Sequence, residues 1–344
     1  MASCRDRSLH RGDGDLDGRQ RAGDGEAHPH GGEWAGGNAG VRQARESHAV
    51  PRARPDGARA RDHGVDDLEA GWRLWAAHQV LSVPVGDLRI AYRESGKGDP
   101  VLFINGTGES GATWAAQMRA LPGYRCVAID PRDTGESSYV TTSYRPSDLA
   151  RDAAGVIDGL GLAPCHVVGF SLGGATAQEL ALVRPELVRS LVLLSTWARS
   201  DGYFIAQMNN WQAIRRAHWE DEASFLLSLE AWLFSPATFA NEELRRSIYT
   251  MWLEEETQQS EGWIRQTEAD IAHDALDRLG DVRCPALVIV GEDDICTPPR
   301  YAEELARALP RAELVRIPNA GHCAVFEQPD AVARAIRAFL DAQG

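Results

Sequence analysis

Short apolar runs recur along the chain from about residue 85 onward, separated by stretches of helical character. Five runs have the length of buried strands and are rich in aliphatic side chains: residues 101–104, 127–129, 166–170, 191–195 and 285–291. The last of these is continuous enough to predict a buried parallel strand. Residues 312–317 alternate apolar and polar side chains like a further strand, whereas residues 172–183 and 301–309 have helical character. This alternation of strands and helices is typical of an α/β protein.

A long stretch without strand character, residues 197–279, separates two of the predicted strands. It is too long for a single crossover helix, and it holds six of the ten Trp residues of the chain. Helical spacing is evident in residues 223–234 and 241–253, with Ser235 and Pro236 between them. We therefore expect a helical insertion whose aromatic side chains form either its own core or the wall of a cleft.

The N-terminal part of the chain has a different composition. Residues 1–63 contain few aliphatic side chains, and Arg, Asp, Gly, Ala and His dominate them without periodicity. Such a segment cannot bury enough apolar surface to order itself. It also lacks the apolar stretch of a secretory signal. We expect residues 1–80 to be a disordered tail, or to result from an upstream start site assigned in error.

The charge and the cysteines narrow the classes of function. The formal net charge is −14 at pH 7, which argues against nucleic acid or an anionic membrane as a partner. No apolar stretch approaches the length of a membrane span. The six cysteines lack metal-binding spacing. We therefore expect no metal, no cofactor and a reduced, cytoplasmic environment.

The candidate chemistry begins at residues 169–173, which read Gly-Phe-Ser-Leu-Gly. This run lies where a predicted strand meets a predicted helix. A sharp strand-to-helix turn exposes the hydroxyl of Ser171, and Gly169 and Gly173 remove side chains that would collide with the backbone there. The dipole of the following helix favours negative charge at the same place. Ser171 is therefore a candidate nucleophile.

A serine nucleophile requires a base, and the base requires a group that orients it. Asp293 and Asp294 follow the strand that ends at residue 291, at the sheet edge where α/β proteins build their sites. Asp201, which follows an earlier strand, is a third candidate acid. His322 follows the last predicted strand through a short loop that contains glycine, and this placement makes it the candidate base.

The order of serine, aspartate and histidine along the chain resembles that of the α/β-hydrolase family. Residues 101–108 resemble the strand and oxyanion loop of that family. Residues 127–137 resemble its next strand and the Asp-x-Arg-Gly-x-Gly-x-Ser turn that follows. The resemblance extends from about residue 85 to residue 344.

This resemblance implies the organisation of the chain. An α/β-hydrolase has a mostly parallel central sheet flanked by helices. Its core would comprise residues 81–196 and 280–344, and residues 197–279 would form a helical cap over the nucleophile.

The resemblance also implies roles for individual residues. Ser171 would be the nucleophile and His322 its base. The family's Gly-x-x-Asp pattern selects Asp294 over its neighbour as the orienting acid. The oxyanion hole would be formed by the backbone N–H groups of Thr107 and Leu172.

Two positions depart from the family pattern. Asn105 stands where the family most often has His, and Asp133 stands where it commonly has Gly. Neither is a triad position, and backbone groups build the oxyanion hole. We therefore expect these substitutions to alter local loop shape and to leave the reaction unchanged.

The sequence predicts a serine hydrolase that cleaves apolar carboxylic esters or lactones through an acyl-enzyme. Family members with the same triad also hydrolyse carbon–carbon bonds or act as cofactor-free haloperoxidases and perhydrolases. The fold can also serve as a small-molecule receptor with residual hydrolase activity, and these functions remain alternatives. Within the cap, Trp197 and Trp211 are expected to face substrate, because they lie nearest to the strand that leads into it.

Overall fold

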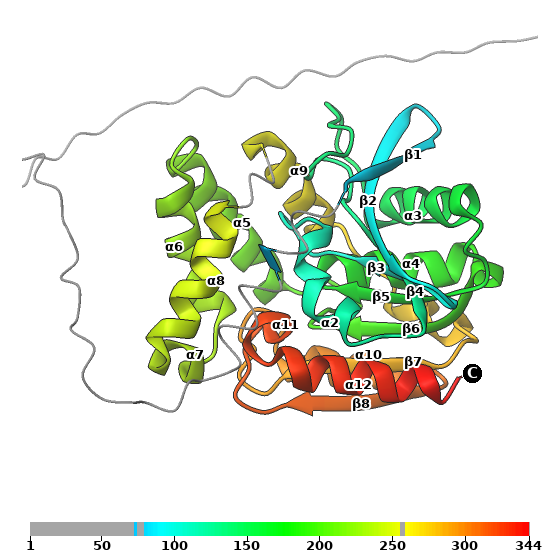
Figure 1. Cartoon of the computed structure of the whole chain (residues 1–344). Helices are drawn as coiled ribbons and strands as arrows, with labels where there is room; N and C mark the ends of the chain where they lie inside the picture. The colour runs from blue at the N-terminus through cyan, green and yellow to red at the C-terminus, as the bar shows by residue number, and fades with distance from the viewer. Residues whose placement is uncertain (1–71, 74–78, 255–258, 344) are drawn as a thin grey trace, which may run out of the picture. The chain divides into compact units, whose positions relative to one another are not determined.

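A central β-sheet organises the computed structural model, which describes residues 72–73, 79–254 and 259–343 (Figure 1). Its eight strands in this part of the chain lie in the order β1-β2-β4-β3-β5-β6-β7-β8. Their bounds are β1 (Leu81–Val85), β2 (Leu88–Gly96), β3 (Asp99–Ile104), β4 (Tyr124–Ile129), β5 (Cys165–Phe170), β6 (Val188–Leu194), β7 (Ala286–Gly291) and β8 (Ala312–Ile317). β1 and β2 run antiparallel to their neighbours and all other pairs are parallel, so the predicted mostly parallel sheet is confirmed.

Strands β3 to β8 correspond to the six strands that the sequence predicts. The hairpin of β1 and β2 is not singled out by the apolar pattern. Its two-residue turn is nevertheless visible in the sequence as Gly86-Asp87, and Gly86 has a φ of 56° that glycine adopts without strain.

Helices flank the sheet and also fill the segment between β6 and β7. Those that follow or precede strands of the core are α2 (Ala115–Arg119), α3 (Pro146–Leu160), α4 (Leu172–Val183), α10 (Pro299–Ala308), α11 (Ala324–Glu327) and α12 (Pro329–Asp341). Short 3-10 turns are η1 (Gly111–Trp114), η2 (Pro185–Leu187) and η3 (Leu276–Asp281).

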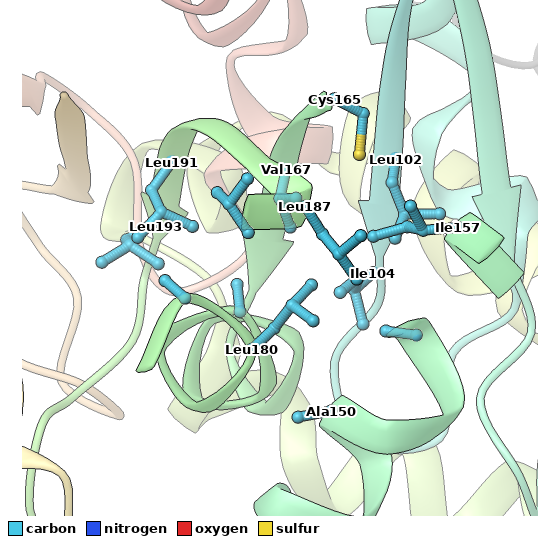
Figure 2. Close-up of a cluster of buried hydrophobic side chains, with 14 of the residues drawn as sticks. Leu102, Ile104, Ala150, Ile157, Cys165, Val167, Leu180, Leu187, Leu191 and Leu193 are labelled. Carbon is cyan, nitrogen blue, oxygen red and sulfur yellow. The ribbon is translucent and has the colours of Figure 1, made fainter. Parts of the chain in front are cut away.

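Alternating side chains of the strands build two apolar layers, one on each face of the sheet. Leu102 of β3 and Val167 of β5 belong to the apolar layer that also contains side chains of α3, α4 and α10, and Figure 2 shows Leu180 of α4 facing them. The neighbouring residues Val101 and Val168 point the other way and pack with α2 and α12. This two-residue period follows from the pleat of a strand, and it sandwiches the sheet between helices.

The parallel arrangement of β3 to β8 decides where chemistry can occur. Because these strands run in the same direction, the loops after their carboxyl ends meet at one edge of the sheet. The loops after β3, β5, β7 and β8 carry Thr107, Ser171, Asp294 and His322 respectively, so these residues share that edge.

In the described residues between β6 and β7, five helices form an insertion: α5 (Gly202–Ala217), α6 (Glu222–Leu233), α7 (Pro236–Ala240), α8 (Glu242–Glu254) and α9 (Ser260–Ile271). The predicted helices at residues 223–234 and 241–253 correspond to α6 and α8. Helices α5, α6 and α8 lie together beside the sheet in Figure 1. An apolar cluster that includes Phe204, Trp211 and Phe225 joins α5 to α6 and reaches Ala175 of α4.

The predicted N-terminal tail falls mostly outside the described residues. Trp72, which the sequence analysis assigns to that tail, is 7% exposed and packs with Trp114 and Phe326 in the apolar layer of α2 and α12. A large aromatic side chain at this depth contributes to the core. The part of the chain that packs on the core therefore begins earlier than the expected boundary at residue 80.

Within the described part of the chain, no helix combines the length and the apolar character needed to cross a membrane.

Candidate active site

Ser171 occupies the sharp turn between β5 and α4. It has φ 52° and ψ −117°, a conformation that residues with a side chain adopt rarely. Its N–H donates to the carbonyl of Leu194 in β6 at 3.0 Å, and its own carbonyl accepts from the hydroxyl of Thr196 at 2.8 Å. These bonds from β6 and the loop after it hold the turn, while Ser171 lines a cavity at the sheet edge.

The two glycines that flank Ser171 are required by close approach of the backbone. A Cβ at Gly169 would lie 2.3 Å from the carbonyl oxygen of Gly173, and a Cβ at Gly173 would lie 2.1 Å from that of Ile104. Both distances are far below van der Waals contact. Any side chain at either position would therefore push α4 away from the sheet and displace Ser171.

His322 lies between Ser171 and Asp294. Its Nε2 atom is 3.2 Å from the Oγ of Ser171, and its Nδ1 atom is 3.1 Å from the Oδ2 of Asp294. The ring also packs against Phe170, with ring centroids 5.1 Å apart. Three loops that are distant in sequence thus bring together the serine, the histidine and the aspartate that the sequence singles out.

The structure distinguishes Asp294 from Asp293 and Asp201, the two other candidates for the acid that orients His322. Asp294 is buried, whereas Asp293 is exposed and donates its backbone N–H to the carbonyl of Ala320. Asp201 caps the N-terminus of α5 by accepting from the N–H of Phe204 at 2.9 Å. Only the carboxylate of Asp294 contacts the imidazole of His322 among these three.

Thr297 is a further residue of this constellation, and the sequence analysis does not identify it. Its backbone N–H and its hydroxyl both donate to the carboxylate of Asp294, at 2.7 and 2.8 Å. Its Oγ1 also lies 3.2 Å from the Nδ1 of His322. The signal that could have revealed it is the three-residue spacing, because aspartate side chains commonly accept from backbone a few positions later.

The electrostatic setting of His322 favours its protonated form. Burial lowers the pKa of His322, but its interaction with Cys296 and the charge and hydrogen bond of Asp294 outweigh this and raise the pKa well above its usual value. Burial also raises the pKa of the Cys296 thiol, so the thiol is neutral near pH 7. Asp294 therefore carries the negative charge that stabilises an imidazolium at His322.

The N–H groups expected to form an oxyanion hole lie beside Ser171. Thr107 follows β3 and lines the same cavity, and Leu172 is the first residue of α4. A Cβ built on Gly106 would lie only 3.1 Å from the Cβ of Ser171, which shows how closely this loop approaches the serine. Among the hydrogen bonds of the described residues, none uses the N–H of Thr107 or of Leu172. Both groups are therefore available to a ligand.

Two adjoining cavities open onto this edge. The inner one, of about 490 Å³, contains Ser171 and His322. The outer one, of about 580 Å³, shares Thr107, Leu229 and Trp263 with it. The insertion contributes six apolar side chains to the inner wall: Phe204, Met208, Trp211, Leu229, Leu233 and Trp263.

The expectation that Trp197 faces substrate is wrong. Trp197 is fully buried, belongs to the lining of neither cavity, and donates its indole N–H to Ser200 at 2.9 Å. Its ring packs on Phe204, with centroids 4.2 Å apart. Trp211 lines the inner cavity as expected, and Trp263 lines both. Trp197 precedes α5 and belongs to the apolar cluster of the insertion, whereas side chains of α5, α6 and α9 line the inner cavity, so nearness to β6 along the chain did not predict contact with the cavity.

Helix α9 contacts the loop after β3 directly. Gln266 accepts from the N–H of Gly108 at 2.8 Å, and Asp270 accepts from the hydroxyl of Thr107 at 2.8 Å. The amide of Gln266 also donates to Thr134, in the turn after β4, at 2.9 Å. The insertion therefore positions the loop that carries Thr107, a function that no local pattern in residues 260–271 indicates.

A buried carboxylate secures the loop that carries His322. Glu327 accepts from the N–H of Gly321 at 2.7 Å, and from the N–H of Ser235 and the hydroxyl of Thr238 at 2.7 Å each. Burial raises the pKa of Glu327. These bonds tie the residue before His322 to the insertion near α7.

The α/β-hydrolase fold family matches residues 99–329 of this sequence. That range includes Ser171, Asp294 and His322 together with the strands that carry them. The chain belongs to the α/β-hydrolase fold family.

Individual members of the family are similar over most of the described chain. BpoC of Mycobacterium tuberculosis, named as a candidate non-heme bromoperoxidase, is 33% identical over 74% of this chain and 98% of its own length. A thermophilic esterase from Thermogutta terrifontis has a TM-score of 0.69 and 28% identity, covering 77% of this chain and 99% of its own. The enol-lactonase from Burkholderia xenovorans has a TM-score of 0.68 and 25% identity, covering 76% of this chain and 100% of its own.

The two departures from the family pattern have structural explanations. Asn105 is buried and donates its side-chain amide to the carbonyl of Ile129 at 3.1 Å, so it ties the end of β3 to β4. Asp133 has a φ of 65°, a region that glycine adopts freely and aspartate tolerates better than most residues. Its carboxylate binds Arg265 of α9, an interaction that glycine could not make.

Proposed function

We propose that the protein is a serine hydrolase that cleaves carboxylic esters or lactones through an acyl-enzyme. The observation that carries this proposal is the continuous hydrogen-bonded line from Ser171 through His322 to Asp294. A largely apolar cavity above that line supports an apolar substrate.

Acylation would begin with attack of the Ser171 Oγ on the substrate carbonyl. The neutral imidazole of His322 holds its proton on Nδ1, facing Asp294, so Nε2 can take the proton from Ser171. The C–O bond to the leaving alcohol then breaks, and His322 passes the same proton to that alcohol. Asp294 stabilises the imidazolium that exists between these two transfers.

Deacylation repeats the steps with water as the nucleophile. His322 removes a proton from water, water attacks the acyl carbon, and the proton returns to the Oγ of Ser171. In both halves the carbonyl oxygen becomes negative and would be bound by the N–H groups of Thr107 and Leu172, at the positive end of α4.

Helices α5 to α9 would act as the cap that the resemblance implies, over residues 197–279, with the core in residues 81–196 and 280–344. The apolar wall contributed by this cap excludes water and strengthens electrostatic interactions inside the site. A cytoplasmic location belongs to the same proposal. The five described cysteines, which are all free thiols and mostly buried, support it.

A second candidate function is perhydrolysis, in which hydrogen peroxide replaces water as the acceptor of the acyl group. The similarity to BpoC favours this candidate. The same acyl-enzyme serves both reactions, so the two functions differ only in which nucleophile attacks it.

Turnover of p-nitrophenyl esters from acetate to octanoate tests the proposal. We expect sustained turnover that Ser171→Ala abolishes, together with loss of labelling by a fluorophosphonate probe. Ser82→Ala, which alters an exposed serine on β1, is the matched control and should label normally. Adding hydrogen peroxide and measuring peracid separates hydrolysis from perhydrolysis.

Three results would contradict the proposal. Normal labelling of Ser171→Ala would show that another residue is the nucleophile. Binding of esters without release of p-nitrophenol would favour a receptor. Hydrolysis of a carbon–carbon substrate with no ester turnover would favour a carbon–carbon hydrolase.

A further inference from the structure

Asp270 lines the same inner cavity as Ser171 and His322. It comes from α9 and is only 3% exposed. Its Oδ2 accepts from the Thr107 hydroxyl at 2.8 Å, whereas its Oδ1 is buried and has no hydrogen-bond partner among the described residues. A buried polar atom left in this state is costly unless a ligand satisfies it.

Among the described residues, no cationic side chain forms a hydrogen bond or an ion pair with Asp270, and His322 is the one group lining the inner cavity whose charge opposes the effect of burial. Burial raises the pKa of Asp270 to about 7, opposed by the hydrogen bond from Thr107 and the charge of His322. The other titratable groups that line the cavity are Glu109, Cys296 and Cys323, and none of them is a cation. Near neutral pH the group is therefore present both as a neutral acid and as a carboxylate.

Asp270 lies close to where the reacting carbonyl would be held. Thr107 offers its N–H to that carbonyl oxygen under the proposed function, and the hydroxyl of the same residue binds Asp270. A polar group on the carbon next to the scissile carbonyl would therefore come within reach of the free Oδ1.

We propose that Asp270 is a specificity-determining residue that binds a hydroxyl group on the carbon next to the scissile carbonyl. The preferred substrates would then be 2-hydroxyacyl esters or lactones. This inference rests on the proposed ester hydrolysis and names the substrate class of that site.

A hydroxyl group fits Asp270 better than other polar groups do. It accepts a hydrogen bond from the neutral acid and donates one to the carboxylate, so Oδ1 is satisfied in both states. A keto or ether oxygen only accepts, and an ammonium group only donates. A plain alkyl ester satisfies neither state and leaves Oδ1 without a partner, which lowers its rate relative to the hydroxylated analogue.

Phenyl propanoate and the two enantiomers of phenyl 2-hydroxypropanoate form a matched set for the test. The enantiomers have identical intrinsic reactivity, and the effect of the hydroxyl on reactivity is removed by dividing by the hydroxide-catalysed rates. For the wild-type protein we expect kcat/KM to favour one hydroxylated enantiomer about tenfold over the other and over propanoate, the scale of one good hydrogen bond.

Variants at Asp270 separate binding of the hydroxyl from a purely structural role. Asp270→Asn keeps a donor and an acceptor and should retain the enantiomer preference within about threefold. Asp270→Leu and Asp270→Ala should both lose it, with ratios near one. Asp277→Leu removes an exposed carboxylate from η3 and should leave the preference intact. Melting temperatures identify any variant that fails to fold.

The outcomes distinguish this inference from the proposed function. Unchanged enantiomer ratios in Asp270→Leu or Asp270→Ala, with all esters hydrolysed, would overturn the inference and leave ester hydrolysis standing. If the wild-type protein hydrolyses none of the esters, ester hydrolysis fails. The inference is then decided by binding measurements on the Ser171→Ala variant and on the double variant Ser171→Ala with Asp270→Leu. We expect the single variant to bind the hydroxylated ester more tightly than the plain ester, and the double variant to bind both alike. Equal affinities of the single variant for the two esters would overturn the inference.

Discussion

Asp133 and Arg265 form a two-point ion pair between the turn after β4 and helix α9. The guanidinium Nε lies 2.8 Å from Oδ2 of Asp133, and Nη2 lies 2.9 Å from Oδ1. The side chain of Asp133 is fully buried, and that of Arg265 is 15% exposed. The pair anchors α9, the same helix from which Gln266 and Asp270 bind the loop after β3.

Removing the side chain of Arg265 should lower the free energy of unfolding more than removing that of Asp133. Arg265→Ala takes away the guanidinium that compensates a buried carboxylate, and we expect a loss of about 3 kcal/mol in the free energy of unfolding. Asp133→Gly relieves the positive φ and leaves a guanidinium that can reach water, so its loss should be smaller. Urea denaturation of both variants and of the double variant measures this order. A larger loss in Asp133→Gly would contradict it.

The two neighbouring acids should differ sharply in their effect on catalysis. Asp294→Asn removes the negative charge beside His322 and should lower kcat by up to about ten-thousandfold, the scale for a triad histidine that loses its orienting carboxylate. Asp293→Asn alters an exposed side chain and should leave kcat nearly unchanged. Steady-state kinetics on one ester compares them, and the reverse ranking would transfer the role to Asp293.

The raised pKa of His322 should set the acid limb of the pH profile. The base must be neutral to accept a proton, so kcat/KM should fall as pH drops through a pKa well above 6.5. Removing the Asp294 charge lowers the pKa of His322, so Asp294→Asn should shift the remaining activity toward lower pH. The measurement is kcat/KM for a non-ionising ester between pH 5 and 9. A wild-type plateau that continues below pH 6 would contradict it.

Substitution of a tryptophan in the insertion should affect either activity on bulky esters or stability, depending on whether its side chain lines a cavity. Trp263→Ala enlarges both cavities, so kcat/KM should fall for bulky esters and change little for acetate esters. Trp211→Ala should behave similarly in the inner cavity. Trp197→Ala removes a fully buried side chain, and we expect a loss of about 3 kcal/mol in stability without dependence on ester size. An ester-size series with melting curves distinguishes these results.

The carboxyl group of Asp270 should make stability depend on pH. Its pKa is raised from 3.8 to about 7 in the folded protein, so between these values the folded state binds more protons than the unfolded state. The group therefore lowers the free energy of unfolding by about 1.4 kcal/mol for each pH unit in that window. Asp270→Asn removes this slope, and the variant should gain stability relative to wild type between pH 4 and pH 7. Urea midpoints of the wild-type protein and of Asp270→Asn at pH 4 and pH 7 measure this gain. A stability difference between the two proteins that is the same at both pH values would contradict the prediction.

The sequence by itself determined the order of the strands that carry the site and the residues Ser171, Asp294 and His322 as candidates. These signals are local, because strand alternation and the spacing of Gly169 and Gly173 depend on positions a few residues apart. The parallel direction of the strands then places their following loops at one edge. The requirement for glycine at position 169 comes from the turn itself, whereas at Gly173 it is enforced by the backbone of β3, which the local sequence does not show.

Only the tertiary structure decided which residues of the insertion meet the site. Asp270, Gln266 and Arg265 look like ordinary surface residues of an amphipathic helix, and their partners Thr107, Gly108 and Asp133 lie more than 100 positions away in sequence. The same packing buried Trp197 and brought Trp263 to the cavity. Helical periodicity indicates which side chains share a face of a helix. The direction in which that face points depends on how the helices pack against the sheet.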